Sequence, residues 1–211
     1  MAQFFEIHPV DPQPRLIRQA AAIVNRGGVI ALPTDSSYAL AAQLDDKSAA
    51  ERLRRIRRVD ERHHMTLCCS DLSEIASYAR LDNQQYRLIK AVTPGAYTFI
   101  LEATREVPRR LSHPQRRTIG LRVPAHPVAK ALLAELGRPL LTTTLVPPGE
   151  TDPLNDPEEI RARFEHEIDL VIDSGACIRQ PTTVVDLTGG TPELVRAGAG
   201  PLEPLGLTAS A

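Results

Sequence analysis

The strongest structural signal in the chain lies in Gly28-Val-Ile-Ala-Leu-Pro-Thr-Asp-Ser-Ser-Tyr-Ala-Leu40. Its first five residues form a short apolar run, which is typical of a buried strand, and Pro33 ends that run. Hydroxyl-bearing residues and one carboxylate follow directly, from Thr34 to Tyr38. Because open α/β sheets bind ligands in the loops that follow their strands, this segment predicts a buried strand that ends in a polar, ligand-facing loop.

Helical and strand patterns alternate on both sides of this segment. Apolar spacing predicts a helix over 14–26, ended by Gly27-Gly28, and caps or periodicity predict further helices at 48–58, from 71, and at 83–92, 127–136 and 157–166. Apolar or β-rich runs predict strands at 65–69, 97–101, 118–123, 140–144, 168–173, 182–187 and 193–195. This alternation predicts an α/β fold with a twisted mixed central sheet and flanking helices. We expect a single domain over residues 1–200 and a C-terminal tail over 201–211.

Composition limits the classes of protein to consider. The 211 residues are 42% hydrophobic, which is ordinary for a folded domain, and 25 Lys+Arg against 26 Asp+Glu give a net charge of -1. That balance excludes a protein that grips nucleic acid by bulk positive charge, so any anion site must be local. Three cysteines and the lack of a long apolar run favour a cytoplasmic protein that spans no membrane.

Familiar metal and nucleotide motifs are missing. The six histidines include the adjacent pair His63-His64, but the sequence has no Cys-x-x-Cys or His-Glu-x-x-His, so we expect no dedicated metal site and a structural or surface role for these histidines. Cys68 and Cys69 lie in an apolar strand, where buried and inert thiols are common. Neither of the two best-known glycine-rich phosphate loops occurs.

One arginine stands inside an apolar strand. Arg122 follows Thr118-Ile-Gly-Leu, and a guanidinium there is costly unless it meets a carboxylate or faces a cleft. Both interpretations stay open. Further hydroxyls occur at the strand ends Thr142–Thr144 and Thr182-Thr183, although threonine is also a good strand former.

Taken in order, five segments resemble the YrdC-like family of L-threonylcarbamoyladenylate synthases, and most closely its YciO branch. Residues 28–40 are similar to the family's opening strand and Pro-Thr-Asp/Glu-Thr-x-Tyr-Gly-Leu loop, and 93–101 to its Trp-Pro-Gly-x-x-Thr-x-Ile-Leu segment. Residues 118–127 resemble its Gly-x-Arg-x-Pro-x-His-Pro, 181–187 its Ser-Ser/Thr-x-x-Asp-Leu strand, and 193–198 its Leu-Arg-x-Gly ending. Each motif alone is weak, but five in sequence are specific.

The resemblance implies an α/β fold with a large concave cleft. In active relatives the reaction joins threonine, bicarbonate and ATP, with Mg²⁺ as a possible companion of ATP, into threonylcarbamoyl-AMP for tRNA modification. By position, Thr34, Tyr38 and Arg122 match residues on the threonine side. The nucleotide side is matched by Arg57, Arg58, Thr144, Thr182 and Arg196.

The chain departs from the family pattern at three places. Active members carry Lys-x-Arg where this chain has Arg57-Arg58-Val59-Asp60, and Ala39 replaces the glycine of Tyr-Gly-Leu. In the family's Thr-Ser-x-Asn-x-Ser-Gly, Thr144 keeps a hydroxyl but Val146 stands where asparagine is expected. A hydrogen bond to a charged group contributes about 1.5–3 kcal/mol, so losing two or three would weaken ATP handling by orders of magnitude.

Three functional hypotheses follow. The first is a YciO-type protein that binds nucleotide or RNA in its cleft and has weak or redirected synthase activity; a full synthase is an alternative if Arg57 and Arg58 both point into the cleft. The other alternative is a non-catalytic protein that binds double-stranded RNA or tRNA through phosphate contacts. Its candidate cations are Arg52, Arg55, Arg57, Arg58, Arg109, Arg110, Arg116 and Arg117.

Overall fold

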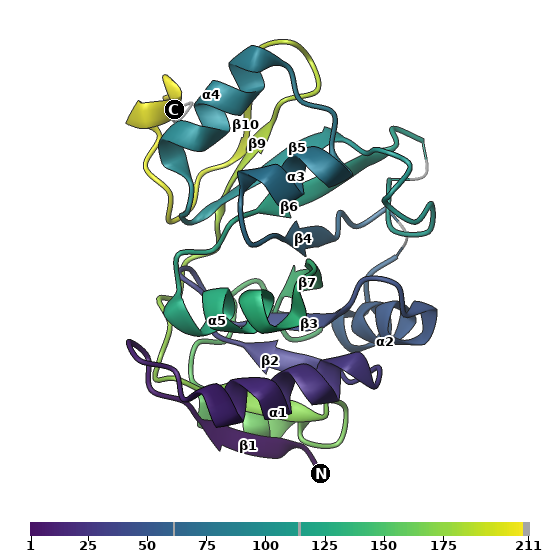
Figure 1. The fold of residues 1–211 in the computed structure, drawn as a ribbon, viewed down its shortest axis with the longest axis vertical. Coiled ribbons are helices and arrows are strands. Elements are labelled where there is room, and N and C mark those ends of the chain that lie inside the picture. The colour runs from purple at the N-terminus through teal and green to yellow at the C-terminus, as the bar shows by residue number, and fades with distance from the viewer. Residues whose placement is uncertain (61, 114, 209–211) are drawn as a thin grey trace.

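The apolar run after Gly28 forms a central strand of the computed structural model, which describes residues 1–60, 62–113 and 115–208 (Figure 1). The strands are β1 (Gln3–Glu6), β2 (Ile30–Leu32), β3 (Ala39–Gln43), β4 (Thr66–Cys68), β5 (Tyr97–Glu102), β6 (Thr118–Arg122), β7 (Leu140–Thr144), β8 (Leu170–Asp173), β9 (Thr183–Asp186) and β10 (Glu193–Arg196). The helices are α1 (Pro14–Asn25), α2 (Lys47–Arg57), α3 (Leu72–Tyr78), α4 (Asn83–Val92), α5 (Pro127–Leu136), α6 (Pro157–Phe164) and the short 3-10 helix η1 (Glu203–Leu205).

All ten of these strands join one twisted sheet in the order β1-β8-β2-β3-β7-β4-β6-β5-β9-β10 (Figure 1). The sheet contains both parallel pairs, such as β4 with β6 and β5 with β9, and antiparallel pairs, such as β3 with β7 and β5 with β6. The predicted α/β fold with a twisted mixed sheet and flanking helices is therefore confirmed.

Alternating side chains of the strands enter two apolar cores. Ile30 and Leu32 of β2 pack with α1 and α5, whereas Ala31 between them belongs to the larger core that also contains residues of α2, α3, α4 and α6. This is the two-residue period of a strand whose faces are both covered. The helices thus cover the apolar side chains of the sheet, and polar side chains at the strand ends remain available to bind a ligand.

Two strands were missed by the sequence prediction. Ala39–Gln43 forms β3, which pairs antiparallel with β2 so that Leu32 faces Ala39. Three of its five residues are alanine, a residue that is depleted in strands, and its apolar character continues on both faces. The polar loop after β2 is therefore the connection between two antiparallel strands. The second missed strand is β1, at the edge of the sheet next to β8.

The segment that follows residue 200 packs against the domain as far as it is described. The Tyr97 hydroxyl donates a hydrogen bond of 2.9 Å to the carbonyl of Pro201, and η1 lies against α4. Leu205 is 6% exposed and belongs to the larger core. The part of the expected C-terminal tail from residue 201 to residue 208 thus contacts the domain, and residues 209–211 lie outside the described part of the chain.

Across the described residues, no helix is both long enough and apolar enough to cross a bilayer.

Leu205→Ala tests the packing of this last segment. Because Leu205 is buried in the core, its truncation should lower the free energy of unfolding by about 2–3 kcal/mol, measured by urea denaturation. Leu202→Ala, at a partly exposed position of the same segment, should cost less. Equal and small effects of the two substitutions would show that the segment does not belong to the core.

Candidate functional site

A concave cavity of about 650 Å³ lies over the middle of the sheet. Its walls come from β3, β4, β5, β6, β7, β9 and β10, together with the end of α2 and the residues that follow it. Five of the eight sequence-predicted site residues line it. They are Arg57, Arg122, Thr144, Thr182 and Arg196.

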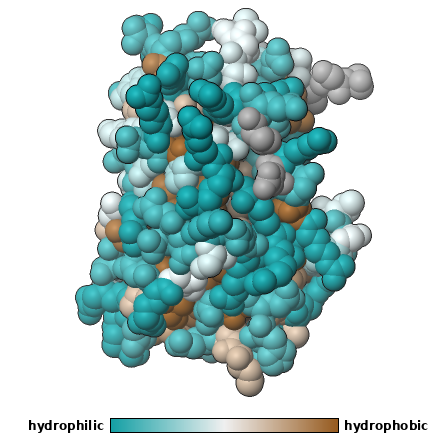
Figure 2. Space-filling model, turned by 90° about the vertical axis from the view of Figure 1, so that its right-hand side faces the viewer, coloured by the Kyte–Doolittle hydropathy of each residue, from teal (hydrophilic) through white to brown (hydrophobic). Residues whose placement is uncertain are grey.

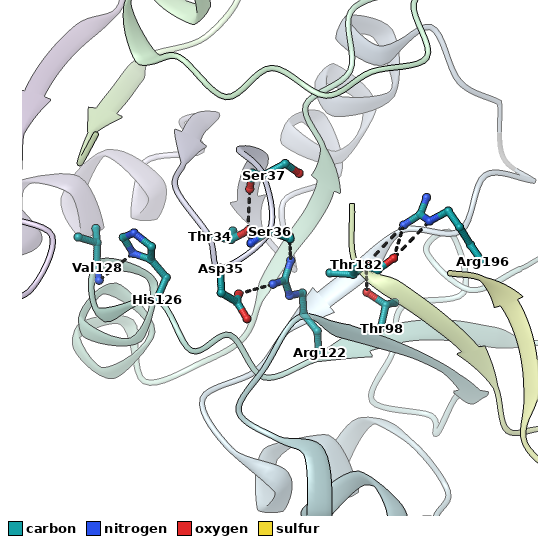
Figure 3. Close-up of polar contacts among 10 residues, drawn as sticks. All are labelled: Thr34, Asp35, Ser36, Ser37, Thr98, Arg122, His126, Val128, Thr182 and Arg196. Carbon is teal, nitrogen blue, oxygen red and sulfur yellow. Dashed lines mark hydrogen bonds and ion pairs between the residues drawn. The ribbon is translucent and has the colours of Figure 1, made fainter. Parts of the chain in front are cut away.

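Arg122 is the most deeply buried cation of this cavity. Its side chain, the last of β6, is 6% exposed, and one terminal nitrogen lies 2.5 Å from the Asp35 carboxylate (Figure 3). The other terminal nitrogen is 3.4 Å from the Ser36 hydroxyl, and its Nε atom and the second Asp35 oxygen have no partner among the described residues. Both sequence interpretations hold together, because Arg122 is ion-paired and also lines the cavity.

Thr34 and Tyr38 hold the loop that carries Asp35. The Thr34 hydroxyl donates to the Ser37 carbonyl at 2.6 Å and accepts from the Ser36 amide at 3.2 Å (Figure 3). The fully buried Tyr38 donates from its hydroxyl to the Gly175 carbonyl at 3.0 Å, and burial raises the pKa of this phenol. Neither residue lines the cavity, so the structure gives both a positioning role, and Ser37 faces the cavity instead.

Thr182 and Arg196 form the opposite wall. The Thr182 hydroxyl is 2.9 Å from that of Thr98 on β5, and the Arg196 guanidinium donates to the Thr182 carbonyl at 3.0 Å (Figure 3). The pairing register of β9 with β10 shifts between Leu194 and Arg196. Such a bulge re-aims side chains, and here Arg196 lines the cavity although it is close to the end of an edge strand.

The neighbouring arginines at the end of α2 point to different places. Arg57 lines the cavity and donates a hydrogen bond to the Val146 carbonyl, while its Nε atom finds no partner among the described residues. Arg58 follows with φ +50°, in the left-handed region, and its side chain is exposed outside the cavity. The reversal of the chain at the helix end explains why only one of the pair reaches the cavity.

Threonines of β7 and two histidines complete the floor and rim. Thr142 donates to the Thr66 carbonyl at 2.9 Å, and Thr143 lies 3.2 Å from His63 Nε2, next to Thr144. His64 Nε2 lies 3.2 Å from the Thr118 hydroxyl, and its ring stacks on His113 with centroids 5.0 Å apart.

The histidines are the functional candidates that the sequence interpretation missed. Burial lowers the pKa of both, helped by the positive Arg57 beside His63 and by His113 beside His64. Both imidazoles are therefore neutral at pH 7 and can donate or accept hydrogen bonds in the cavity. The only sequence signal for this placement is that the two histidines follow soon after the end of a predicted helix. That they are adjacent to each other does not indicate which way their side chains point.

Other candidate groups lie elsewhere. Cys68 and Cys69 are buried, and burial raises the pKa of Cys68 to about 12, which agrees with the predicted inert thiols. Within residues 1–60, 62–113 and 115–208, no cluster of three metal-ligating side chains occurs.

The charge of the cavity favours an anionic occupant. Among the described residues, its lining includes one carboxylate, Glu150, which is ion-paired with Arg163, and four arginines, Arg57, Arg62, Arg122 and Arg196. Guanidinium groups bind carboxylates and phosphates bidentately, and the surrounding hydroxyls can complete their hydrogen bonding. The arrangement can therefore hold an anion and neutralise negative charge that develops on it.

Of the cations considered for RNA binding, two besides Arg57 make contacts within the protein. Arg52 is ion-paired with Asp169 at 2.6 Å. Arg110 donates to the carbonyls of Leu44 and Asp45, the latter at 2.9 Å.

Comparison with known proteins agrees with this geometry. The Sua5/YciO/YrdC family model, described as telomere recombination, matches residues 22–198. The YciO protein of Escherichia coli K12 is 53% identical over 204 residues, which are 97% of this chain and 99% of that protein, and an uncharacterized protein of Haemophilus influenzae is 54% identical over 205 residues, with the same coverage.

Solved structures give the same result. The crystal structure of E. coli YciO superposes with a TM-score of 0.94 and covers 97% of this chain and all of its own. P. abyssi Sua5 complexed with L-threonine superposes with a TM-score of 0.87 at 26% identity, over 95% of this chain and 58% of Sua5. The family model matches most of the chain, and a relative is 53% identical over nearly the full length of both proteins. The chain therefore belongs to the Sua5/YciO/YrdC family.

Proposed function

We propose that the cavity binds ATP together with a threonine-like amino acid and supports a weak or redirected L-threonylcarbamoyladenylate synthase activity, related to tRNA modification. In that reaction the threonine amine and bicarbonate form a carbamate with loss of water, a carboxylate oxygen of this carbamate attacks the α-phosphorus of ATP, and pyrophosphate leaves. The observation that carries the proposal is the convergence of Arg57, Arg122 and Arg196 on one 650 Å³ cavity.

Arg122 is the proposed partner of the amino-acid carboxylate. Its Nε atom is buried without a partner, so a ligand oxygen would satisfy a donor that the protein leaves open. The complex of P. abyssi Sua5 with L-threonine supports binding of a small molecule of this kind in the family.

Arg57, Thr144, Thr182 and Arg196 are the proposed nucleotide partners. Arg57 and Arg196 would offset the charge of the triphosphate, while the two hydroxyls would donate to its oxygens. Mg²⁺ would enter as a companion of ATP, held chiefly by the phosphates. Because Arg58 is exposed, the cavity has one cation where the hypothesis of a full synthase required two.

Pyrophosphate release tests the proposal. Purified protein with Mg-ATP, bicarbonate and threonine should release pyrophosphate slowly and in a threonine-dependent manner. Arg122→Ala should reduce this release at least tenfold, because removing a charge-assisted contact costs about 1.5–3 kcal/mol. Arg87→Ala, at an exposed position of α4 away from the cavity, is the control and should not change it. Pyrophosphate release that does not depend on threonine, or that is unchanged in Arg122→Ala, would contradict the proposed activity.

Val146→Asn should strengthen nucleotide binding. Val146 lines the cavity at the position where the family pattern has asparagine, and an amide side chain restores one donor and one acceptor. One regained hydrogen bond to a phosphate should lower the Kd for ATP about tenfold, as measured by isothermal titration calorimetry. The isosteric Val146→Thr serves as control. A Kd that stays unchanged in Val146→Asn would place the nucleotide elsewhere.

Acidification should make His63 and His64 contribute to anion binding. Since their pKa values are lowered below 6.5, both are neutral at pH 7.5 and gain positive charge only as the pH falls below that ordinary value. The ratio of ATP Kd between His63→Gln and wild type should be near one at pH 7.5 and rise toward about three as the pH falls below 6.5 and His63 becomes protonated, as expected for one added charge near the phosphates. Protonation of ATP cancels because both proteins are compared at the same pH. A Kd ratio that stays near one over the whole pH range would show that a protonated His63 does not lie close to the bound phosphates.

A further inference from the structure

A second concavity, of about 720 Å³, lies on the connection between β5 and β6 (residues 103–113 and 115–117) and shares no lining residue with the first. Five arginines line it: Arg80, Arg105, Arg109, Arg116 and Arg117. The connection lies at the right of the view in Figure 1, and Figure 2 shows that side of the molecule as a largely hydrophilic face. Nothing in the function proposed for the first cavity uses these arginines.

The positive charge of this concavity is nearly uncompensated. Glu102, the one carboxylate among its described lining residues, lies 3.8 Å from Arg80, and both side chains are more than half exposed. Among the described residues, no carboxylate lies within ion-pair distance of Arg105, Arg109 or Arg117. The concavity is therefore locally positive, although the net charge of the whole chain is -1.

The described parts of this connection are anchored to the rest of the protein. Val107 and Leu111 are 4% and 2% exposed and anchor the connection in the larger core. The Thr104 hydroxyl donates to the Ser77 carbonyl at 2.8 Å, and the Ala103 amide donates to the Arg117 carbonyl at 2.9 Å. The exposed guanidinium groups are thus presented from a preorganised frame, which lowers the entropy cost of binding a ligand.

Arg117 adopts a backbone conformation that does not suit arginine. Its φ is +53°, in the left-handed region where glycine or asparagine would be unstrained. Strained residues of this kind tend to occur where their side chains have a function. The adjacent residues Arg109 and Arg110 also point to different places. Arg110 donates to backbone carbonyls of the protein, whereas Arg109 lines the concavity.

We propose that this concavity, the β5–β6 arginine site, binds a chain of phosphate groups. Guanidinium groups favour phosphate through paired hydrogen bonds, and several of them spread over one hollow match several phosphates better than one. An RNA backbone and a free polyphosphate share this chemistry. The Arg116 amide donates at 3.2 Å to His113 Nδ1, and His113 stacks on His64 of the first cavity, so the two sites are neighbours.

Binding of a labelled 20-base-pair RNA duplex, followed by fluorescence anisotropy between low and moderate salt, tests the site. The triple variant Arg105→Gln, Arg109→Gln, Arg117→Gln should bind the duplex at least tenfold more weakly, and its log K against log salt slope should decrease by about two to three. The charge-matched triple variant Arg15→Gln, Arg18→Gln, Arg87→Gln, at exposed positions outside both cavities, should stay within twofold of wild type.

Arg117→Gly guards against misfolding as an explanation. Glycine relieves the left-handed strain, so this variant should melt at the same or a higher temperature while it binds the duplex about threefold more weakly. Competition with tripolyphosphate identifies the source of the phosphates: displacement of the duplex indicates a free polyphosphate, and failure to displace it indicates nucleic acid. If both triple variants lose the duplex equally, or neither does, the site is refuted, whereas ATP binding to the first cavity reports on the proposed function separately.

Discussion

The buried contact between Arg122 and Asp35 sets the conditions for the rest of the site. A guanidinium that is 6% exposed on a central strand would destabilise the fold by several kcal/mol if it had no anion beside it. Asp35 supplies that anion at 2.5 Å, but only because the β2–β3 loop carries it there. The internal hydrogen bonds of Thr34 and the burial of Tyr38 therefore serve the charge balance of Arg122, and they do so without facing the cavity.

The sequence predicted the parts of this arrangement that depend on local pattern. Apolar runs located eight of the ten strands, and the isolated arginine in a β-rich run correctly indicated a charge that needs a partner. The pattern could not tell that Arg57 enters the cavity while Arg58 leaves it, because one left-handed residue at the end of α2 decides this. His63 and His64 were missed for a similar reason, since their direction depends on β7 and β6, which are distant in the sequence.

Charge is distributed in this molecule in a way that composition conceals. A net charge of -1 is compatible with two separate arginine-lined hollows because, among their described lining residues, only Glu150 and Glu102 are acidic, so the other described acidic residues lie outside both hollows. The electrostatic potential in a cleft depends more on the nearest charged groups than on the net charge of the protein, because salt screens the more distant charges. The argument from net charge excludes only binding by bulk charge, and it leaves local phosphate recognition open.

The residues that follow β7 bear on the proposed binding of a nucleotide. Arg57 donates to the backbone carbonyl of Val146, so a phosphate must compete with an existing hydrogen bond for this guanidinium. The side chain of Val146 offers no polar atom in return. Exchanging the hydrogen bond to Val146 for one to a phosphate contributes less than the roughly 1.5–3 kcal/mol of a new charged hydrogen bond, although the Nε atom of Arg57, like that of Arg122, has no partner among the described residues. If the cavity binds a nucleotide as proposed, the place where the family pattern has been lost offers it a guanidinium that is already hydrogen-bonded and a side chain without polar atoms, and this limits the binding energy available there.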